Sequence, residues 1–101
     1  MISSTAEDYL KAVLRMEDRH EKASTSSVAR HLEVADASVT DMLRKLQKAG
    51  LLEYKPYYGA SLTKTGRAVA LRILRRHRLI ELFLHQIMNP APQPETTIGP
   101  S

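Results

Sequence analysis

The sequence contains no cysteine and no tryptophan, and it has one phenylalanine. The lack of cysteine excludes a disulfide framework and any metal site built on thiolates. A core must come from aliphatic side chains and methionine, and the hydrophobic content of 43% allows one. No apolar run approaches the roughly 20 residues that span a bilayer, and the first residues lack the basic and apolar regions of a signal peptide. We therefore expect a cytoplasmic protein with no membrane partner.

Length, charge and proline distribution bound the organisation of the chain. A chain of 101 residues has room for one domain, and its formal net charge of +4 permits a polyanionic partner such as DNA. Four of the five prolines follow Asn89, in a segment with almost nothing apolar to bury. Such a composition is typical of disorder, because little burial offsets the conformational entropy lost on folding. We predict one domain over residues 1–88 and a disordered, proline-rich tail over residues 89–101.

The first part of the chain has the pattern of three helices. Ser4 and Glu7 have the spacing of a capping box, which predicts that the first helix starts near Ser4. The Ser/Thr run at residues 24–27 predicts the start of a short second helix. A third helix is predicted over residues 37–49, with Asp36 as its N-cap. A short helix followed, after a tight turn, by a capped helix indicates a helix-turn-helix.

A hairpin and a long helix are predicted next. Gly50 is a suitable residue to end the third helix. Residues 51–55 and 60–63 have the pattern of two strands around a turn at 56–59, and a helical pattern then covers 63–88. This order predicts a mainly α fold: a winged helix-turn-helix with three helices, a β-hairpin wing and a long C-terminal helix.

The third predicted helix has two opposite faces. At about 100° per residue its apolar side chains gather on one face, which consists of Val39, Met42, Leu43 and Leu46. The other face is small near its start and basic near its end, and it consists of Ala37, Asp41, Arg44, Lys45 and Lys48. A recognition helix has this arrangement, because its first residues approach base edges while later cations reach phosphates. Ser38 and Thr40 flank the face, and the Asp41 carboxylate is suited to accept from cytosine N4.

Further candidate DNA contacts lie outside the third helix. They are Ser26 in the second helix and Lys55, Tyr57 and Tyr58 in the wing, where phosphates or the minor groove are the expected targets. The alternatives are a solvated amphipathic helix and a wing with ordinary solvated lysines and aromatic packing. The order of helix, helix and hairpin favours DNA, so a double-stranded operator is the expected partner.

Several motifs carry a family resemblance over residues 4–88. They are Ala6–Leu10, Ala37–Leu43, Gly50–Tyr54, Tyr58-Gly59, Leu62–Gly66 and Arg76–Leu84. With this spacing the chain resembles the N-terminal half of the diphtheria-toxin-repressor and manganese-transport-regulator family of metal-dependent repressors. The resemblance implies a homodimer whose DNA binding is switched on by Mn²⁺ or Fe²⁺.

The resemblance also implies metal ligands at Asp8, His77 and Glu81. The sequence departs from the family pattern at two points. Lys11 stands where manganese-type members carry a ligating glutamate, and the pattern ends at Asn89, before the helices that bring further ligands. The implied Mn²⁺ or Fe²⁺ site is therefore incomplete, and a weakened metal response is expected.

The residues themselves leave the metal site open. His77 and Glu81 lie on the apolar stripe of the long helix, which predicts that they face inward. A carboxylate and an imidazole suit a divalent ion, but a buried hydrogen bond between them, or capture of a neighbouring arginine by Glu81, explains the pattern as well. Asp8 lies opposite the apolar stripe of the first helix and is nominated by the resemblance alone. Its alternative role is that of a carboxylate favoured by the helix dipole.

The end of the long helix is apolar nearly all round, at Leu79, Ile80, Leu82, Phe83, Leu84, Ile87 and Met88. The core of one domain covers about one face of such a helix. A second copy of the chain is the simplest cover for the rest, so we expect a homodimer through the last helix.

These features together predict a sequence-specific DNA-binding transcriptional repressor. The alternatives are a winged-helix regulator that does not sense metal and a winged-helix module that docks other proteins through its last helix. The basic face of the third helix argues against the docking module, which has no need of it. A hydrolase built on His77, Glu81 and His85 lacks a nucleophile motif and a Gly-rich loop, so we do not expect an enzyme.

Overall fold

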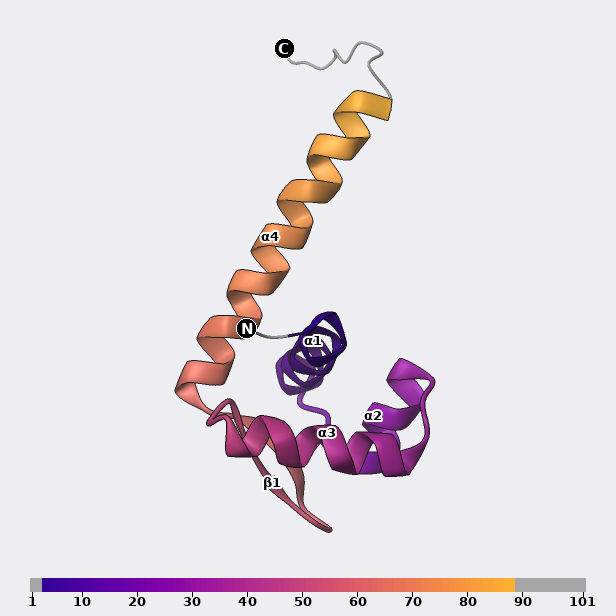
Figure 1. Ribbon diagram of the computed structural model, residues 1–101, viewed down its shortest axis with the longest axis vertical. Coiled ribbons are helices and arrows are strands. Elements are labelled where there is room, and N and C mark those ends of the chain that lie inside the picture. Colours follow the sequence, from indigo (N-terminus) through magenta and orange to yellow (C-terminus); the bar gives the residue numbers. More distant parts are fainter. Residues whose placement is uncertain (1–2, 89–101) are drawn as a thin grey trace.

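The computed structural model describes residues 3–88 (Figure 1). The elements follow in the order α1 (Ser4–Asp18), α2 (Thr25–Leu32), α3 (Asp36–Lys48), β1 (Leu52–Lys55), β2 (Gly59–Leu62) and α4 (Lys64–Met88). This order confirms the predicted winged helix-turn-helix of the mainly α class. The predicted tail, residues 89–101, lies outside the described residues. Among residues 3–88, no helix is long and apolar enough to cross a membrane.

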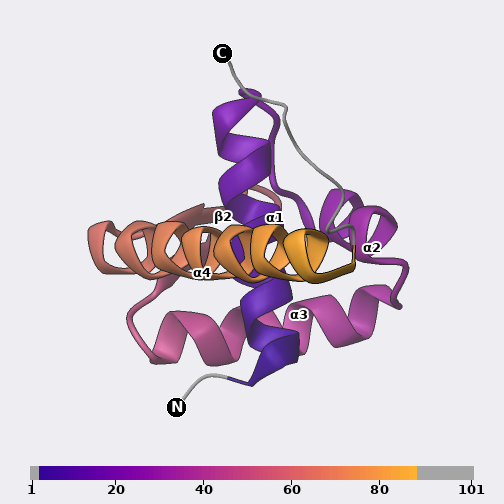
Figure 2. The same ribbon diagram turned by 90° about the horizontal axis from the view of Figure 1, so that it is seen from above.

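Helix α1 lies at the centre of the core. Its Leu10, Val13 and Leu14 have no exposed surface, because every other helix and the hairpin pack around it. The elements α1, α2, α3 and the hairpin of β1 and β2 are called the body below. Figure 2 shows α4 crossing over α1, with α3 on the far side of this body. The other elements contribute further fully or almost fully buried side chains, including Val28, Val39, Leu43, Leu52, Ala70 and Ile73.

The start of α1 differs by one residue from the capping signal in the sequence, whereas the start of α2 agrees with its signal. The N-cap of α1 is Ser3, whose Oγ accepts a hydrogen bond from the Ala6 amide at 3.1 Å. The capping box predicted for Ser4 and Glu7 is therefore wrong, because the Glu7 carboxylate extends to α4 instead of back to its own helix end. Ser24 caps α2 as expected, through a bond from the Ser27 amide at 3.1 Å.

The start of α3 also corrects a prediction. Ala35 occupies the N-cap position, and no side chain caps the helix there. Asp36 lies in the first turn instead, where the helix dipole favours a carboxylate. At the other end, Gly50 adopts a φ of +81° just beyond the helix, a conformation that favours glycine and turns the chain into β1.

The wing is an antiparallel hairpin held against the body. β1 pairs with β2 in the register Leu52↔Leu62 to Lys55↔Gly59. The Ala60 amide donates to the Ala23 carbonyl at 2.9 Å, which joins the hairpin to the loop after α1. Gly59 has a φ of +96°, and a Cβ at this position would lie 2.9 Å from the same carbonyl oxygen. This close approach therefore requires glycine.

Helix α4 begins inside the body and ends outside it. Gly66 lies so close to the Leu51 backbone that any Cβ would overlap its carbonyl group. Ala70 and Ile73 are buried in the core, but the helix then rises away from α1 (Figure 1). The prediction that the later apolar stripe faces inward is therefore wrong for a single chain. Ile80, for example, is 49% exposed, because the helix outlasts the body that could cover it.

Candidate DNA-binding face and metal position

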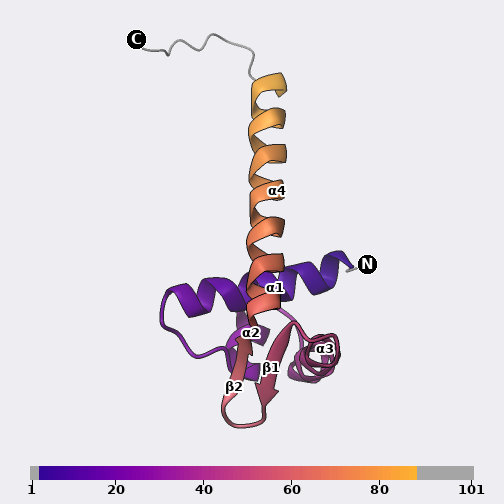
Figure 3. The same cartoon turned by 90° about the vertical axis from the view of Figure 1, so that its left-hand side faces the viewer.

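The helix-turn-helix and the wing share one end of the molecule. Figure 3 shows α3 beside the hairpin of β1 and β2, with α4 rising from the opposite side of the body. The buried face of α3 consists of Val39, Leu43 and Leu46, with Met42 partly buried against the core. The opposite face therefore points to solvent, as its periodicity predicts.

The exposed face of α3 carries the predicted DNA-binding side chains. Thr40 is half-buried, and the others are exposed: Ala37, Ser38, Asp41, Arg44, Lys45 and Lys48. Asp41 and Lys45 form an ion pair at 3.2 Å, which adds little to stability because both side chains are largely exposed. Arg44 and Lys48 form no ion pair within residues 3–88, so their charges face outward. This face can contact bases near its start and phosphates near its end.

A groove of about 530 Å³ separates α3 from the wing. It is lined by Arg44, Gln47, Lys48, Tyr54 and Pro56. The Gln47 Oε1 accepts a hydrogen bond from the Tyr54 amide at 3.1 Å, so the side chain ties α3 to β1. The Tyr54 hydroxyl lies 3.2 Å from Thr25 Oγ1 at the start of α2. Sequence reasoning missed Gln47, although its place one turn after Arg44 and shortly before β1 is the signal that could have found it.

The wing tip carries two aromatic rings in solvent. Tyr57 is 94% exposed and Tyr58 is 76% exposed, so neither ring packs on the body and the aromatic-packing alternative is wrong. Lys55 is exposed at the end of β1, and Ser26 is exposed on α2. The Lys22 Nζ donates to the Tyr57 carbonyl at 2.8 Å, a contact that fixes the turn and that sequence reasoning missed. The rings and Lys55 are therefore available to an outside partner.

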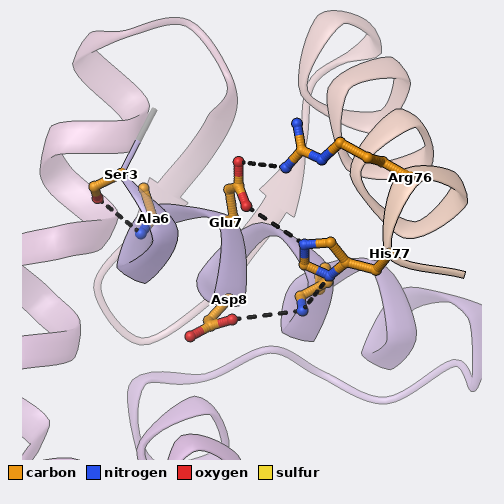
Figure 4. A network of polar contacts seen from close by, with 7 residues as sticks. Ser3, Ala6, Glu7, Asp8, Arg76 and His77 are labelled. Atoms are coloured by element: carbon orange, nitrogen blue, oxygen red, sulfur yellow. Dashed lines mark hydrogen bonds and ion pairs between the residues drawn. The ribbon is translucent and has the colours of Figure 1, made fainter. Parts of the chain in front are cut away.

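The predicted metal ligands Asp8 and His77 do come together, but around a lysine. Figure 4 shows Glu7 and Asp8 of α1 facing His77 and Arg76 of α4. The Lys11 Nζ donates to His77 Nδ1 at 3.1 Å and lies 3.5 Å from Asp8 Oδ1. Because the Lys11 ammonium has donors alone, Nδ1 must accept, and the ring carries its proton on Nε2. An internal cation therefore joins the two candidate ligands.

Glu7 is the carboxylate that sequence reasoning missed at this position. Its Oε2 accepts from Arg76 Nη2 at 2.8 Å, and its Oε1 lies 3.7 Å from His77 Nε2. The hydrogen bond from the Arg76 guanidinium holds the pKa of the Glu7 carboxyl below its ordinary value. The acid that faces His77 is thus Glu7 of α1, and the alternative of a buried hydrogen bond between His77 and Glu81 is wrong.

Glu81 does not complete a metal shell. It is exposed, contrary to the inward position predicted for it, because α4 has left the body by this turn. It lines a cleft of about 310 Å³ together with Lys11, Arg15, Leu74, His77 and Arg78. No three His, Asp, Glu or Cys side chains among residues 3–88 gather as metal ligands do. With His77 Nδ1 already bonded and cations lining the cleft, these residues do not fit a divalent ion.

Two family matches cover the described chain. Residues 1–60 match the family described as iron dependent repressor, N-terminal DNA binding domain. Residues 63–93 match the iron dependent repressor, metal binding and dimerisation domain. The first match covers the helix-turn-helix and most of the wing, and the second covers α4.

Individual relatives agree with these matches. An uncharacterised HTH-type transcriptional regulator of Methanocaldococcus jannaschii is 33% identical over 88 residues, which cover 86% of this chain and 70% of that protein. The HTH-type transcriptional regulator MntR of Bacillus subtilis is 36% identical over 87 residues, covering 86% of this chain and 61% of MntR.

A solved structure gives the same result for the fold. The manganese regulator SloR superimposes with a TM-score of 0.73 at 37% identity, covering 83% of this chain and 39% of SloR. The chain thus spans about three fifths of the length of MntR and two fifths of SloR. The family match over more than half of the chain places it plainly: the chain belongs to the iron-dependent repressor family, a family of DNA-binding transcriptional regulators rather than enzymes.

Proposed function

We propose that this chain binds a palindromic DNA operator as a homodimer and represses transcription. The observation that carries the proposal is the exposed face of α3, which presents the outward charges of Arg44 and Lys48 beside the wing. A helix with this geometry fits the major groove, while a hairpin beside it reaches the flanking backbone. The match of residues 1–60 to a DNA-binding domain supports the same partner.

The proposed contacts divide by position along α3. Ala37, Ser38 and Asp41 lie near the start of the helix, where side chains approach base edges, and Thr40 flanks them. Arg44, Lys45 and Lys48 lie on later turns and are assigned to phosphates. This division makes the early residues responsible for sequence preference and the later ones for affinity.

Two further surfaces extend the proposed contact beyond α3. Lys55, Tyr57 and Tyr58 place a cation and two exposed hydroxyl groups at the wing tip. The tie from Lys22 to the Tyr57 carbonyl holds that tip in one shape, so less ordering is required on binding. Ser26, exposed on α2, is assigned to the phosphate backbone.

The homodimer is proposed to form through the end of α4. Leu79, Leu82 and Phe83 are 62%, 52% and 61% exposed, which leaves a large apolar surface without cover in a single chain. The match of residues 63–93 to a metal binding and dimerisation domain supports this use of the helix. In this proposal residues 1–88 form one DNA-binding unit with its own dimerising helix.

A weak response to Mn²⁺ or Fe²⁺ completes the proposal. Asp8, His77 and Glu81 supply at most three donors, whereas a hard octahedral ion takes about six. Any ion that bound there would take most of its donors from water, and the Lys11 ammonium stands beside two of the three side chains, so the arrangement does not favour tight binding. Metal is therefore expected to change DNA binding little.

The test selects DNA from a randomised duplex library with the full chain and measures affinity for the selected duplex by fluorescence anisotropy. Arg44→Ala together with Lys48→Ala removes two proposed phosphate contacts. We expect weaker binding and a slope of log K against log salt that is flatter by about 1.8, since each contact contributes about 0.9.

The matched control, Arg72→Ala together with Arg75→Ala, removes the same charge from an exposed face of α4. It should leave the slope within about 0.5 of the wild-type value, because these arginines lie away from the proposed DNA face. Failure to select any sequence would favour the protein-docking module instead. Equal losses in both double variants would mean that α3 acts through net charge alone.

A further inference from the structure

The contact between α1 and α4 contains a side-chain cation beside Asp8 and His77, two of the residues at which the resemblance implies metal ligands. Resting on the function proposed above, we infer that the Lys11 ammonium takes the place of the metal in this chain. It joins Asp8 on α1 to His77 on α4 permanently, so that DNA binding requires no divalent ion. The distances of 3.1 Å to His77 Nδ1 and 3.5 Å to Asp8 Oδ1 carry the inference.

The chemistry of this position explains the exclusion. A divalent ion held between Asp8 and His77 would compete with the ammonium for an oxygen of Asp8 and, if it bound through Nδ1, for that lone pair of the imidazole. The other ring nitrogen, Nε2, lies 3.7 Å from Glu7 Oε1, and Glu7 is itself bonded to Arg76. The Lys11 side chain is 17% exposed, so its stem is covered and its charged end is held in place. Displacing it would break both of its charged contacts and would move a mostly covered side chain.

The surrounding charges show how much depends on Lys11. The cleft beside His77 is lined by Lys11, Arg15 and Arg78, against the single carboxylate of Glu81. Glu7, the other acid that faces His77, is bonded to Arg76 at 2.8 Å. With Asp8 included, three carboxylates face three arginines and Lys11, so the ammonium gives the position its excess of positive charge and disfavours a divalent cation.

The remaining links between α1 and α4 follow the same pattern. Arg67 of α4 donates to Glu17 Oε1 and to Asp18 Oδ1 of α1, both at 3.0 Å. Glu17 Oε2 also accepts from the Leu62 amide at 2.7 Å, which brings β2 into the join. Side-chain cations thus hold the body against α4 at both ends of their contact. In this arrangement the position of α4 is set during folding and not by an added ion.

The experiment restores the acid at the blocked position. Three full-length proteins are compared: the wild type, Lys11→Glu and the control Arg72→Glu. Each is freed of metal with EDTA and titrated with Mn²⁺ by calorimetry. The Tm of each is measured with and without Mn²⁺. Arg72→Glu makes the same charge change on an exposed part of α4. Lys11→Glu should bind Mn²⁺ at least about tenfold more tightly than wild type and gain about 4 °C or more in Tm. Wild type and Arg72→Glu should show neither effect.

A second variant covers the case in which Lys11→Glu does not fold without metal. Lys11→Gln removes the ammonium without adding a like charge beside Asp8. It should lower the metal-free Tm, because the charged contacts to Asp8 and His77 are replaced by at most a neutral hydrogen bond from a shorter side chain, and should bind Mn²⁺ more tightly than wild type but less tightly than Lys11→Glu. An unchanged Tm together with an unchanged Mn²⁺ affinity in Lys11→Gln would overturn the inference.

The DNA assay separates this inference from the proposed function. Wild-type affinity for the selected duplex should be equal in EDTA and in Mn²⁺, whereas that of Lys11→Glu should rise with Mn²⁺. If no variant bound DNA but the calorimetry followed the expected pattern, the proposed function would fail and the role of Lys11 would stand. Tight, saturable binding of Mn²⁺ by wild type that disappears in His77→Ala would overturn the inference whatever the DNA result.

Discussion

The two halves of α4 differ in environment more than in composition. Its first half carries Ala70 and Ile73 into the core, where they are 0% and 4% exposed. Its second half carries larger apolar side chains, yet Leu79 and Phe83 are 62% and 61% exposed. Both halves belong to one uninterrupted helix, Lys64–Met88. Burial along this helix therefore depends on what lies beside it. The exposed apolar surface of the second half is of the kind that indicates a protein–protein interface.

The links at the base of α4 sharpen the contrast. Where the helix crosses α1, ion pairs between arginines of α4 and glutamates of α1, together with the bond from Lys11 to His77, hold the two helices together. Beyond that crossing, the described chain offers α4 no element to pack against (Figure 1). The proposed homodimer assigns the cover of this end of α4 to a second chain, and the presentation of α3 to the body.

The largest expected effect comes from removing the same side chain in each region. Leu14→Ala removes a side chain that has no exposed surface and should cost about 3–5 kcal/mol of unfolding free energy at every protein concentration. Leu82→Ala removes a half-exposed side chain and should cost less than about 0.5 kcal/mol at the lowest concentration, rising as dimers form. Thermal unfolding across a concentration series measures both. A concentration-independent cost of several kcal/mol for Leu82→Ala would place it in the core of a single chain.

The next prediction breaks the proposed interface directly. Leu82→Glu together with Phe83→Lys puts two charges on the exposed face of α4 and should yield a folded monomer. The dimer dissociation constant should rise at least about 100-fold, or about 2.8 kcal/mol, because a buried charge without a partner is costly. Light scattering and circular dichroism give the mass and the helical content.

Val34→Glu is the matched control, because Val34 is an exposed apolar residue of the body at 40% exposure. It should leave the dimer intact. If the double variant stayed dimeric, the interface would lie elsewhere. If it lost its helical signal altogether, these side chains would belong to the core of the body.

Sequence periodicity predicted the elements well, because buried faces leave a regular pattern. All four helices and the hairpin occur close to the predicted places. The errors concern which of two available groups a residue at the start of a helix bonds to. Ser3 caps α1 in place of Ser4, and Glu7 bonds Arg76, which lies 69 positions later in the sequence, instead of its own helix end. A local motif gives no information about a partner that arrives only when the chain folds.

The candidate metal position shows the same limit. Placing His77 and Glu81 on one stripe gave their angle around the helix, but not how far the body extends to cover them. His77 does contact α1, whereas Glu81, one turn later, is exposed. Lys11 was noted in the sequence as a departure from the ligating glutamate of manganese-type members, and its bond to His77 goes further, since it occupies one of the two ring nitrogens that could bind a metal. Only the crossing of α1 and α4 reveals that contact.

The smallest expected effect is on sequence preference, which the proposal assigns to the body alone. Asp41 is exposed near the start of α3 and pairs with Lys45 at 3.2 Å. Asp41→Ala should remove a preference for cytosine at one operator position, by about tenfold or about 1.4 kcal/mol, because a carboxylate accepts from cytosine N4. It should also raise affinity for unrelated DNA slightly, since the carboxylate repels phosphates and Lys45 is released.

Lys48→Ala is the matched control for this last measurement, because it removes a side chain from the later, phosphate-facing part of α3. It should weaken binding to every sequence alike and flatten the salt slope by about 0.9. Competition among duplexes that differ at one position measures the preference, first in wild type and then in the monomeric background of Leu82→Glu with Phe83→Lys. Because the proposal assigns base reading to the body alone, Asp41→Ala should shift the preference equally in both backgrounds. A uniform loss on all duplexes would make Asp41 a general contact, and a shift that vanished in the monomer would mean that the second half of α4 takes part in reading the bases.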